Sequence, residues 1–229
     1  MIVAYIDTFF SLLPVLFFFI YWNQAKSERG LWLVVVYSLF FFCINILITS
    51  WKKIPLLYDS LTLVEFLLFS WFLVTQLATQ TTKKILVFLG VLYTIFYVAF
   101  TFYTKAFTST DSIPENTAII DSIPIGIEAI IVLVFSFYYL YEQMRDTTNM
   151  FIYNTFQFWI VLGMVLYLAG SFFIYIFSNN LSGDDVKKYW VITNFFSILR
   201  SIFFTIAIIQ HAKPTKNRLL ADFEVSYLN

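Results

Sequence analysis

The sequence predicts an all-α fold, a polytopic membrane protein built as a bundle of seven transmembrane helices. The 229 residues are 60% hydrophobic and only 12% charged, with a mean hydropathy of +0.80, a balance outside that of ordinary soluble domains. Seven mainly apolar segments also approach or exceed the roughly 20 residues that a helix needs to cross a bilayer. The polar connectors between them are too short to hold a separate domain. The segments are 2–22, 31–50, 58–79, 85–104, 119–141, 151–178 and 189–211.

The first three segments open the bundle. Segment 2–22 lacks the basic region and small-residue cleavage site of a secretory signal, so we expect it to remain as a span. Pro14 predicts a kink or a helix start within it. "NQAKSERG" then leads to 31–50, whose single cysteine, Cys43, excludes an internal disulfide and a multi-cysteine metal site. "WKKIPLLY" leads to 58–79.

The last four segments follow in the same way, after "QTTKK", "TKAFTSTDSIPENTA", "EQMRDTTNM" and "SNNLSGDDVKK". In 151–178, Gly163 and Gly170 are seven residues apart, which predicts close packing against another helix. The last segment carries a polar stripe at steps of three and four residues. We therefore predict one transmembrane domain, 1–211, and a short cytoplasmic tail, 212–229.

The distribution of Lys and Arg predicts the orientation. One side of the bundle carries eight: Lys26, Arg29, Lys83, Lys84, Arg145, Lys213, Lys216 and Arg218. The other side carries five: Lys52, Lys53, Lys105, Lys187 and Lys188. Because cytoplasmic loops are enriched in Lys and Arg, we expect the N-terminus outside and the C-terminus in the cytoplasm.

Polar side chains from several segments are predicted to converge in the outer half of the bundle. At 1.5 Å per residue, Glu65 lies roughly 10 Å, Glu128 about 15 Å and Arg200 roughly 17 Å below the outer boundary. The other predicted members of this layer are Asn194 and Asn45 in the outer half, Ser197 in the polar stripe, and Asp7, Asp59 and Asp121 at the outer rim.

Arg200 requires a partner, because a charge at the centre of a membrane helix costs roughly 2.5 to 3.5 kcal/mol. Glu65 and Glu128 are the predicted partners. The three together would carry a net charge of minus one, so we expect one glutamate to be protonated or hydrated. Two structural alternatives stay open: the salt bridge only locks the helices together, and the stripe hydroxyls bond to their own helix.

The sequence lacks the residues that several classes of membrane protein and enzyme require. The last segment has no lysine for a retinal Schiff base, and a single histidine does not support a zinc hydrolase. There is no Gly-rich phosphate loop and no Ser-His-Asp set. The formal net charge is zero, without blocks of like charge, which gives no basis for nucleic-acid binding. We therefore expect no enzyme, no metal and no cofactor.

Three stretches resemble a family of small seven-helix membrane proteins of Bacteroidota. They are "LYDSLTLVEFLLFSWFL", "NTFQFWIVLGMVLYLAGSFFIYIFS" and "YWVITNFFSILRSIFFTIAII". Members are often encoded near two-component signalling genes, so the resemblance implies a sensory role in the bacterial inner membrane. It supplies no active site, and no residue role is taken from it.

Three functions are weighed on these grounds. The first is a sensor or signalling-accessory protein whose outward-opening polar pocket takes a small molecule and which acts through a membrane or cytoplasmic protein partner. Phe223, Val225 and Tyr227 alternate with polar residues and suit strand addition to that partner; a disordered tail is the alternative. The second is a small, proton-coupled transporter. Such a protein needs a polar route to both faces, and the inner half of the bundle has few polar residues. The third is a scaffolding subunit.

Overall fold

The structure is a computed structural model that describes residues 2–50, 55–107, 122–145, 152–177 and 183–213. Every regular element in these ranges is a helix, so the predicted all-α class is confirmed for the described part of the chain. The elements are α1 (Ile2–Phe10), α2 (Leu13–Ile20), α3 (Trp22–Ala25), α4 (Arg29–Ser50), α5 (Pro55–Gln76), α6 (Gln80–Phe107), α7 (Ser122–Arg145), the 3₁₀ turn η1 (Ile152–Asn154), α8 (Phe156–Phe177) and α9 (Gly183–Ala212).

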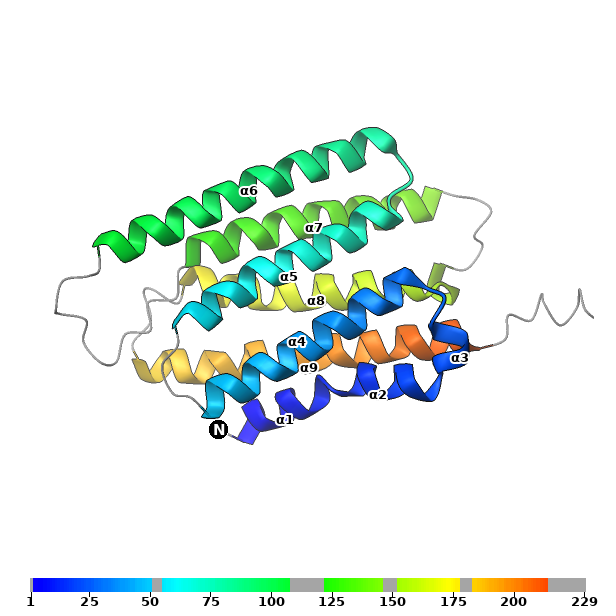
Figure 1. Ribbon diagram of the computed structural model, residues 1–229, viewed down its shortest axis with the longest axis horizontal. Coiled ribbons are helices and arrows are strands. Elements are labelled where there is room, and N and C mark those ends of the chain that lie inside the picture. The colour runs from blue at the N-terminus through cyan, green and yellow to red at the C-terminus, as the bar shows by residue number, and fades with distance from the viewer. Residues whose placement is uncertain (1, 51–54, 108–121, 146–151, 178–182, 214–229) are drawn as a thin grey trace, which may run out of the picture.

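The long helices lie side by side along one axis (Figure 1). Helix α9 packs most extensively against α8 and also contacts α1, α2, α3 and α4. Helix α5 contacts α4, α6 and α7, and α7 in turn packs on α8. Helix α6 forms one edge of the bundle and α1 to α3 form the opposite edge (Figure 1). The candidate site lies in the interior between these helices.

Five helical segments are long and apolar enough to cross a membrane. They are Arg29–Leu47, Gln80–Tyr103, Ile123–Arg145, Phe156–Ile174 and Val191–Ala212, found among the described residues. Two further apolar segments, Tyr5–Ile20 and Leu61–Gln76, overlap the remaining predicted spans but are shorter than these five. The structure thus supports a membrane protein with at least these five apolar helices.

The first predicted span, 2–22, is not one continuous helix. Helix α1 ends at Phe10 and α2 begins at Leu13, with Pro14 at its start. Because proline has no backbone N–H, Pro14 cannot donate to the carbonyl of Phe10. The chain tightens there instead, with Leu12 N donating to Phe9 O at 3.1 Å. The kink or helix start predicted at Pro14 is therefore confirmed.

Several helix ends differ from the predicted boundaries. Helix α9 begins at Gly183, although 178–188 was predicted to be a connector. Helix α7 continues to Arg145 instead of ending near residue 141. A positive charge in the last turn of a helix is favourable, and Arg145 supplies one. The apolar segments were therefore a poor guide to the helix ends, since helices extend beyond the region that hydrophobicity marks.

Two glycines allow α8 and α9 to pack closely. A Cβ atom at Gly163 would lie 3.0 Å from the Cβ of Phe203. A Cβ atom at Gly170 would collide with the ring of Phe196. The predicted role of both glycines in close helix packing is confirmed, and this packing fixes the position of α9.

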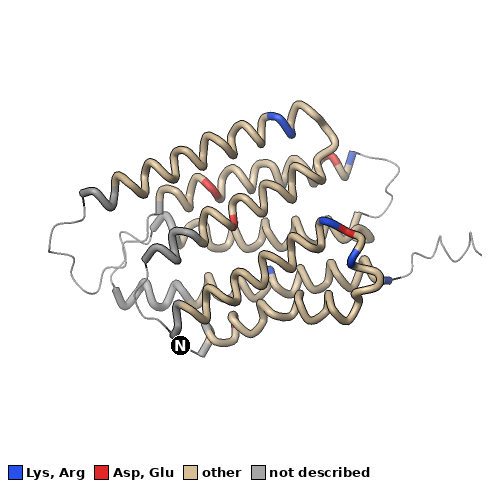
Figure 2. The backbone as a smooth tube through the Cα atoms, viewed as in Figure 1, with Lys and Arg blue, Asp and Glu red and all other residues tan. Residues whose placement is uncertain are grey.

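Among the residues whose side chains are described, charged ones lie mainly at one end of the bundle, and a few lie midway along the helices (Figure 2). That end holds the α3–α4 connection, the start of α6 and the ends of α7 and α9. Six of the eight Lys and Arg residues predicted for the cytoplasmic side are described there: Lys26, Arg29, Lys83, Lys84, Arg145 and Lys213. The midway charges belong to the candidate site.

Candidate functional site

Arg200 lies on α9 with its side chain enclosed by protein and only 1% exposed. Its Nη1 atom donates to Oε1 of Glu65 on α5 at 3.3 Å, which makes a buried ion pair. Its Nη2 atom donates to the hydroxyl of Ser197, three residues earlier on α9, at 2.9 Å. The phenol of Tyr37 on α4 donates to the same oxygen of Glu65 at 3.1 Å. The predicted buried salt bridge between Glu65 and Arg200 is therefore confirmed, and Tyr37 ties α4 to it.

Three aromatic rings surround the guanidinium of Arg200. Its Cζ atom lies 4.0 Å from the ring centroid of Tyr167, 4.7 Å from that of Phe41 and 4.8 Å from that of Tyr37. A cation over an aromatic face gains up to about 2 kcal/mol when water is excluded. The rings thus replace part of the hydration that the buried charge has lost, and Tyr167 brings α8 into the site.

Asp7 approaches the site from α1. It is 5% exposed, it interacts electrostatically with Arg200, and it contacts the hydroxyl of Ser197. Its Oδ1 atom has no hydrogen-bond partner among the described residues. The sequence placed Asp7 at the outer rim, whereas the structure buries it beside Ser197, since α1 packs directly on α9.

Glu128 lies on the other side of Glu65. It is 3% exposed, and its main electrostatic neighbour is Glu65 instead of Arg200. Its Oε1 atom has no hydrogen-bond partner among the described residues. Tyr93 on α6 also interacts electrostatically with Glu128, and its phenol donates to the carbonyl of Pro124 at 3.2 Å. Glu128 is therefore buried beside a like charge and not beside a cation.

Together these residues form a buried polar cluster, which we define as Asp7, Tyr37, Glu65, Tyr93, Glu128, Ser197 and Arg200. It draws on α1, α4, α5, α6, α7 and α9. The buried charged groups in the described ranges are three carboxyl groups and one guanidinium, so full ionisation would give a net charge of one minus three, or minus two. A low-dielectric interior opposes that state, and the cluster is therefore suited to binding positive charge.

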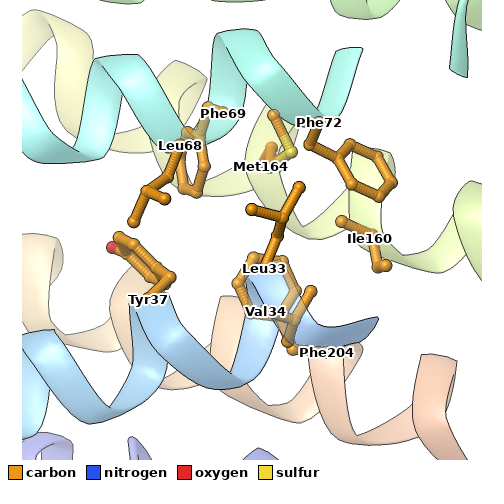
Figure 3. Close-up of a pocket in the computed structure, with 9 residues that line it drawn as sticks. All are labelled: Leu33, Val34, Tyr37, Leu68, Phe69, Phe72, Ile160, Met164 and Phe204. Carbon is orange, nitrogen blue, oxygen red and sulfur yellow. The ribbon is translucent and has the colours of Figure 1, made fainter. Parts of the chain in front are cut away.

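A small cavity adjoins the buried polar cluster at Tyr37 (Figure 3). Its free space for a water molecule is about 10 Å³, at the lower limit of the roughly 10 to 15 Å³ that one water needs. Apart from Tyr37, the side chains around it are apolar: Leu33, Val34, Leu68, Phe69, Phe72, Ile160, Met164 and Phe204. This cavity therefore has no room for a solute larger than water.

The polar stripe on α9 divides into two parts. Ser201 donates to the carbonyl of Ser197 at 3.1 Å, and Thr205 donates to that of Ser201 at 2.9 Å. These two hydroxyls bond to their own helix, as the structural alternative predicted. Ser197, in contrast, accepts from Arg200. Of the four hydroxyls in the stripe, that of Ser197 therefore joins the buried polar cluster and those of Ser201 and Thr205 are satisfied locally. The fourth, that of Thr193, is buried without a hydrogen-bond partner among the described residues.

The structure brings together five of the nine predicted site residues: Asp7, Glu65, Glu128, Ser197 and Arg200. Asn194 and Asn45 are half-buried, on α9 and α4. Asp59 belongs to α5, where its side chain is not described. Asp121 and the predicted docking residues Phe223, Val225 and Tyr227 lie outside the described residues.

Sequence reasoning missed the aromatic partners of Arg200. Tyr37, Phe41 and Tyr167 are 3 of 44 Tyr and Phe residues in the chain, so composition does not single them out. The spacing of Tyr37 and Phe41, four residues apart on one helix face, is the one sequence feature that could have suggested a joint role.

Comparison with models of known protein families, with curated proteins and with solved structures finds no match.

Proposed function

We propose that this chain is an inner-membrane sensor or signalling-accessory protein that crosses the bilayer seven times and acts through a protein partner. The N-terminus lies outside and the C-terminus in the cytoplasm. The five long apolar helices support multiple crossings. Helix α5, with 22 residues, is about 33 Å long at 1.5 Å per residue, and α1 with α2 supplies the seventh crossing.

The observation that carries the proposal is the buried ion pair between Glu65 and Arg200. It joins α5 to α9 at 3.3 Å, and the surrounding contacts add α1, α4 and α8 through Asp7, Tyr37 and Tyr167. A change of charge in this cluster would alter several helix contacts at once. Helix α9 leads directly into the C-terminal tail, so such a change has a short route to a cytoplasmic partner.

A chromosomal substitution tests the signalling role. In the native host, we expect Glu65→Gln to reproduce the change in transcript levels that deletion of the whole gene causes. Membrane amounts of the variant must match those of the wild type. Glu28→Gln, at the charged end of the bundle and outside the cluster, is the matched control and should leave the transcripts unchanged. A wild-type transcript profile for Glu65→Gln, or for the deletion itself, would overturn the proposal.

The C-terminal tail is the proposed docking segment for the partner. Truncation after Lys216 removes Phe223, Val225 and Tyr227 and leaves the described helices intact. We expect this truncation to abolish the same transcript response while the protein remains in the membrane. An unchanged response would remove the docking role of the tail.

A proton-coupled transporter is the second candidate, and the excess of buried carboxyl groups over cations favours it. This function predicts proton movement through the purified protein in liposomes, followed with a trapped pH-sensitive dye. Proton uptake that Glu65→Gln abolishes would place this function first. The tight packing around Arg200 and the small apolar cavity support the sensor instead.

A further inference from the structure

We infer that Glu128 is a proton-binding site, which holds one proton beside the ionised pair of Glu65 and Arg200. The inference deepens the proposed function, and it rests on that function for its role as the input of the sensor. It identifies the ligand of the buried polar cluster as a proton.

The first ground is the position of the Glu128 carboxyl group. The side chain is 3% exposed, and its Oε1 atom has no hydrogen-bond donor among the described residues. A buried carboxylate requires either a cation or several donors to replace its lost hydration. With neither provided at this oxygen, a bound proton is the remaining way to remove the charge.

The second ground is the contrast with Glu65. One oxygen of Glu65 accepts from both Arg200 and Tyr37, at 3.3 and 3.1 Å. Glu65 is therefore stabilised as the anion. Its negative charge acts on Glu128 as a like charge, and two neighbouring carboxylates oppose ionisation of both. The proton consequently resides on Glu128, which lacks the partners that Glu65 has.

Two helices supply the ionisable groups that interact electrostatically with Glu128. Helix α5 supplies Glu65, and α6 supplies Tyr93, which in turn lies near Tyr97. On α8, Tyr167 is the only ionisable side chain between residues 156 and 174, and its ring covers Arg200. None of these groups is a cation placed against Glu128. Asp7 interacts with Arg200 and contacts Ser197.

A metal cation does not fit this position. Sodium, calcium and magnesium ions require several oxygen ligands. The described residues contain no group of three His, Cys, Asp or Glu side chains able to hold a metal ion. Among the described residues, no hydroxyl or amide forms a hydrogen bond with the Oε1 atom of Glu128. A proton needs no such cage and no additional space.

Release of the proton would place a second negative charge between α5 and α7. These helices pack directly on each other, and the added repulsion between Glu65 and Glu128 would weaken this contact. The same repulsion would change the interaction of Glu65 with Arg200 and hence the position of α9. Protonation of Glu128 is thereby linked to the helix that continues into the tail.

Infrared difference spectroscopy of the purified full chain in lipid nanodiscs tests the site directly. A protonated carboxyl group gives a C=O stretching band that ionisation removes. We expect Glu128→Gln to eliminate this band and Glu28→Gln to leave it in place. Persistence of the full band in Glu128→Gln, or no such band in the wild type, would overturn the inference.

The unfolding temperatures of the variants show whether a lost band reflects the loss of the carboxyl group or a failure to fold. Glutamine imitates a protonated glutamate, so Glu128→Gln should unfold at the wild-type temperature, whereas Glu65→Gln should unfold at a clearly lower one. Equal loss of stability in both variants would overturn the inference. A band that responds to replacing Na⁺ with choline at constant pH would also overturn it, in favour of a bound cation.

These measurements separate the inference from the proposed function. The infrared band is a property of the purified protein and does not depend on a partner or on transcription. If the band is absent while Glu65→Gln still alters transcripts, the proton site fails and the sensor stands. If the band is present while the deletion strain has wild-type transcripts, the site stands and the sensor fails.

Discussion

At the scale of single residues, Arg200 depends most on Glu65. Removing the carboxylate with Glu65→Gln leaves a guanidinium that is 1% exposed without its ionic partner. Stranding one member of a buried pair typically costs about 3 to 5 kcal/mol. We expect the free energy of unfolding, measured with a chemical denaturant in detergent micelles, to fall by about this amount. Glu28→Gln is the control and should change it by less than about 0.5 kcal/mol.

The double variant Glu65→Leu with Arg200→Met shows whether the pair itself stabilises the fold. Apolar replacement of a whole buried pair is often neutral or favourable. We therefore expect this double variant to regain most of the stability that Glu65→Gln loses. A double variant as unstable as Glu65→Gln would show that the charges themselves are needed for folding.

Tyr37 makes two separable contributions, one through its hydroxyl and one through its ring. Tyr37→Phe removes the hydrogen bond to Glu65 but keeps a ring under Arg200. A hydrogen bond to a charged group contributes roughly 1.5 to 3 kcal/mol, so we expect a loss near the lower end of that range. Tyr37→Leu removes the ring as well and should be less stable than Tyr37→Phe in the same denaturant titration. Equal stability of the two variants would contradict a role for the ring.

The residue scale also shows what the sequence could predict about the site. Arg200 and Glu65 stand out because charges are rare in apolar segments, and their pairing follows from the need for a partner. Tyr37 and Tyr167 do not stand out, since tyrosine is frequent throughout the chain. That Glu128 faces Glu65 and not Arg200 depends on how α5, α7 and α9 are rotated about their axes, which segment lengths and depths do not determine.

At the scale of helices, the close packing of α8 on α9 requires Gly170. A methyl group there would meet the ring of Phe196, including its Cγ atom, which lies near the backbone and has little freedom to move. Forcing extra volume into a packed interface costs typically about 1 to 3 kcal/mol. We therefore expect Gly170→Ala to lower the free energy of unfolding by about that amount.

Gly90 on α6 is the matched control for that substitution. A Cβ atom there would lie 3.8 Å from the nearest atom, on Phe66, which is ordinary contact. Since alanine favours a helix over glycine by about 1 kcal/mol, Gly90→Ala should be neutral or stabilising. A destabilisation of Gly90→Ala equal to that of Gly170→Ala would contradict the steric explanation.

Glu142 joins the end of α7 to the turn between α5 and α6. Its carboxylate accepts from the backbone N–H groups of Ala78 and Thr79 at 2.9 and 3.2 Å, and from the hydroxyl of Thr79 at 2.6 Å. These groups precede the first turn of α6, where unpaired N–H groups need an acceptor. We expect Glu142→Ala to cost about 1 kcal/mol, as the loss of a helix cap does.

Hydrogen exchange measured by mass spectrometry locates that effect. The amides of Ala78 and Thr79 should exchange faster in Glu142→Ala, and peptides from the middle of α8 should be unaffected. Uniformly faster exchange throughout the bundle would indicate global destabilisation instead of a local one. The substitution therefore distinguishes a clamp on one turn from a contribution to the whole fold.

The existence of the helices was easier to predict than the residues at which they begin and end. Each apolar segment contains a helix because the bilayer requires internally satisfied backbone groups. The ends depend on local features such as Arg145 in the last turn of α7. The break between α1 and α2 depends on the missing N–H of Pro14. Pro14 is visible in the sequence, but whether a proline bends a helix or interrupts it depends on the packing of neighbouring residues.

At the scale of the whole molecule, the charge distribution predicts how the bundle sits in the membrane. Six described Lys and Arg residues share one end with only two described acids, Glu28 and Glu142. By the positive-inside rule, we expect that end to lie in the cytoplasm. Reporter fusions test this. The reporter is a fluorescent protein that folds only in the cytoplasm. Fused after Arg145 it should be bright, and fused after Lys187 it should be dark. Alkaline phosphatase, active only outside, should give the opposite pattern, and a cytoplasmic signal after Lys187 would overturn the proposed topology.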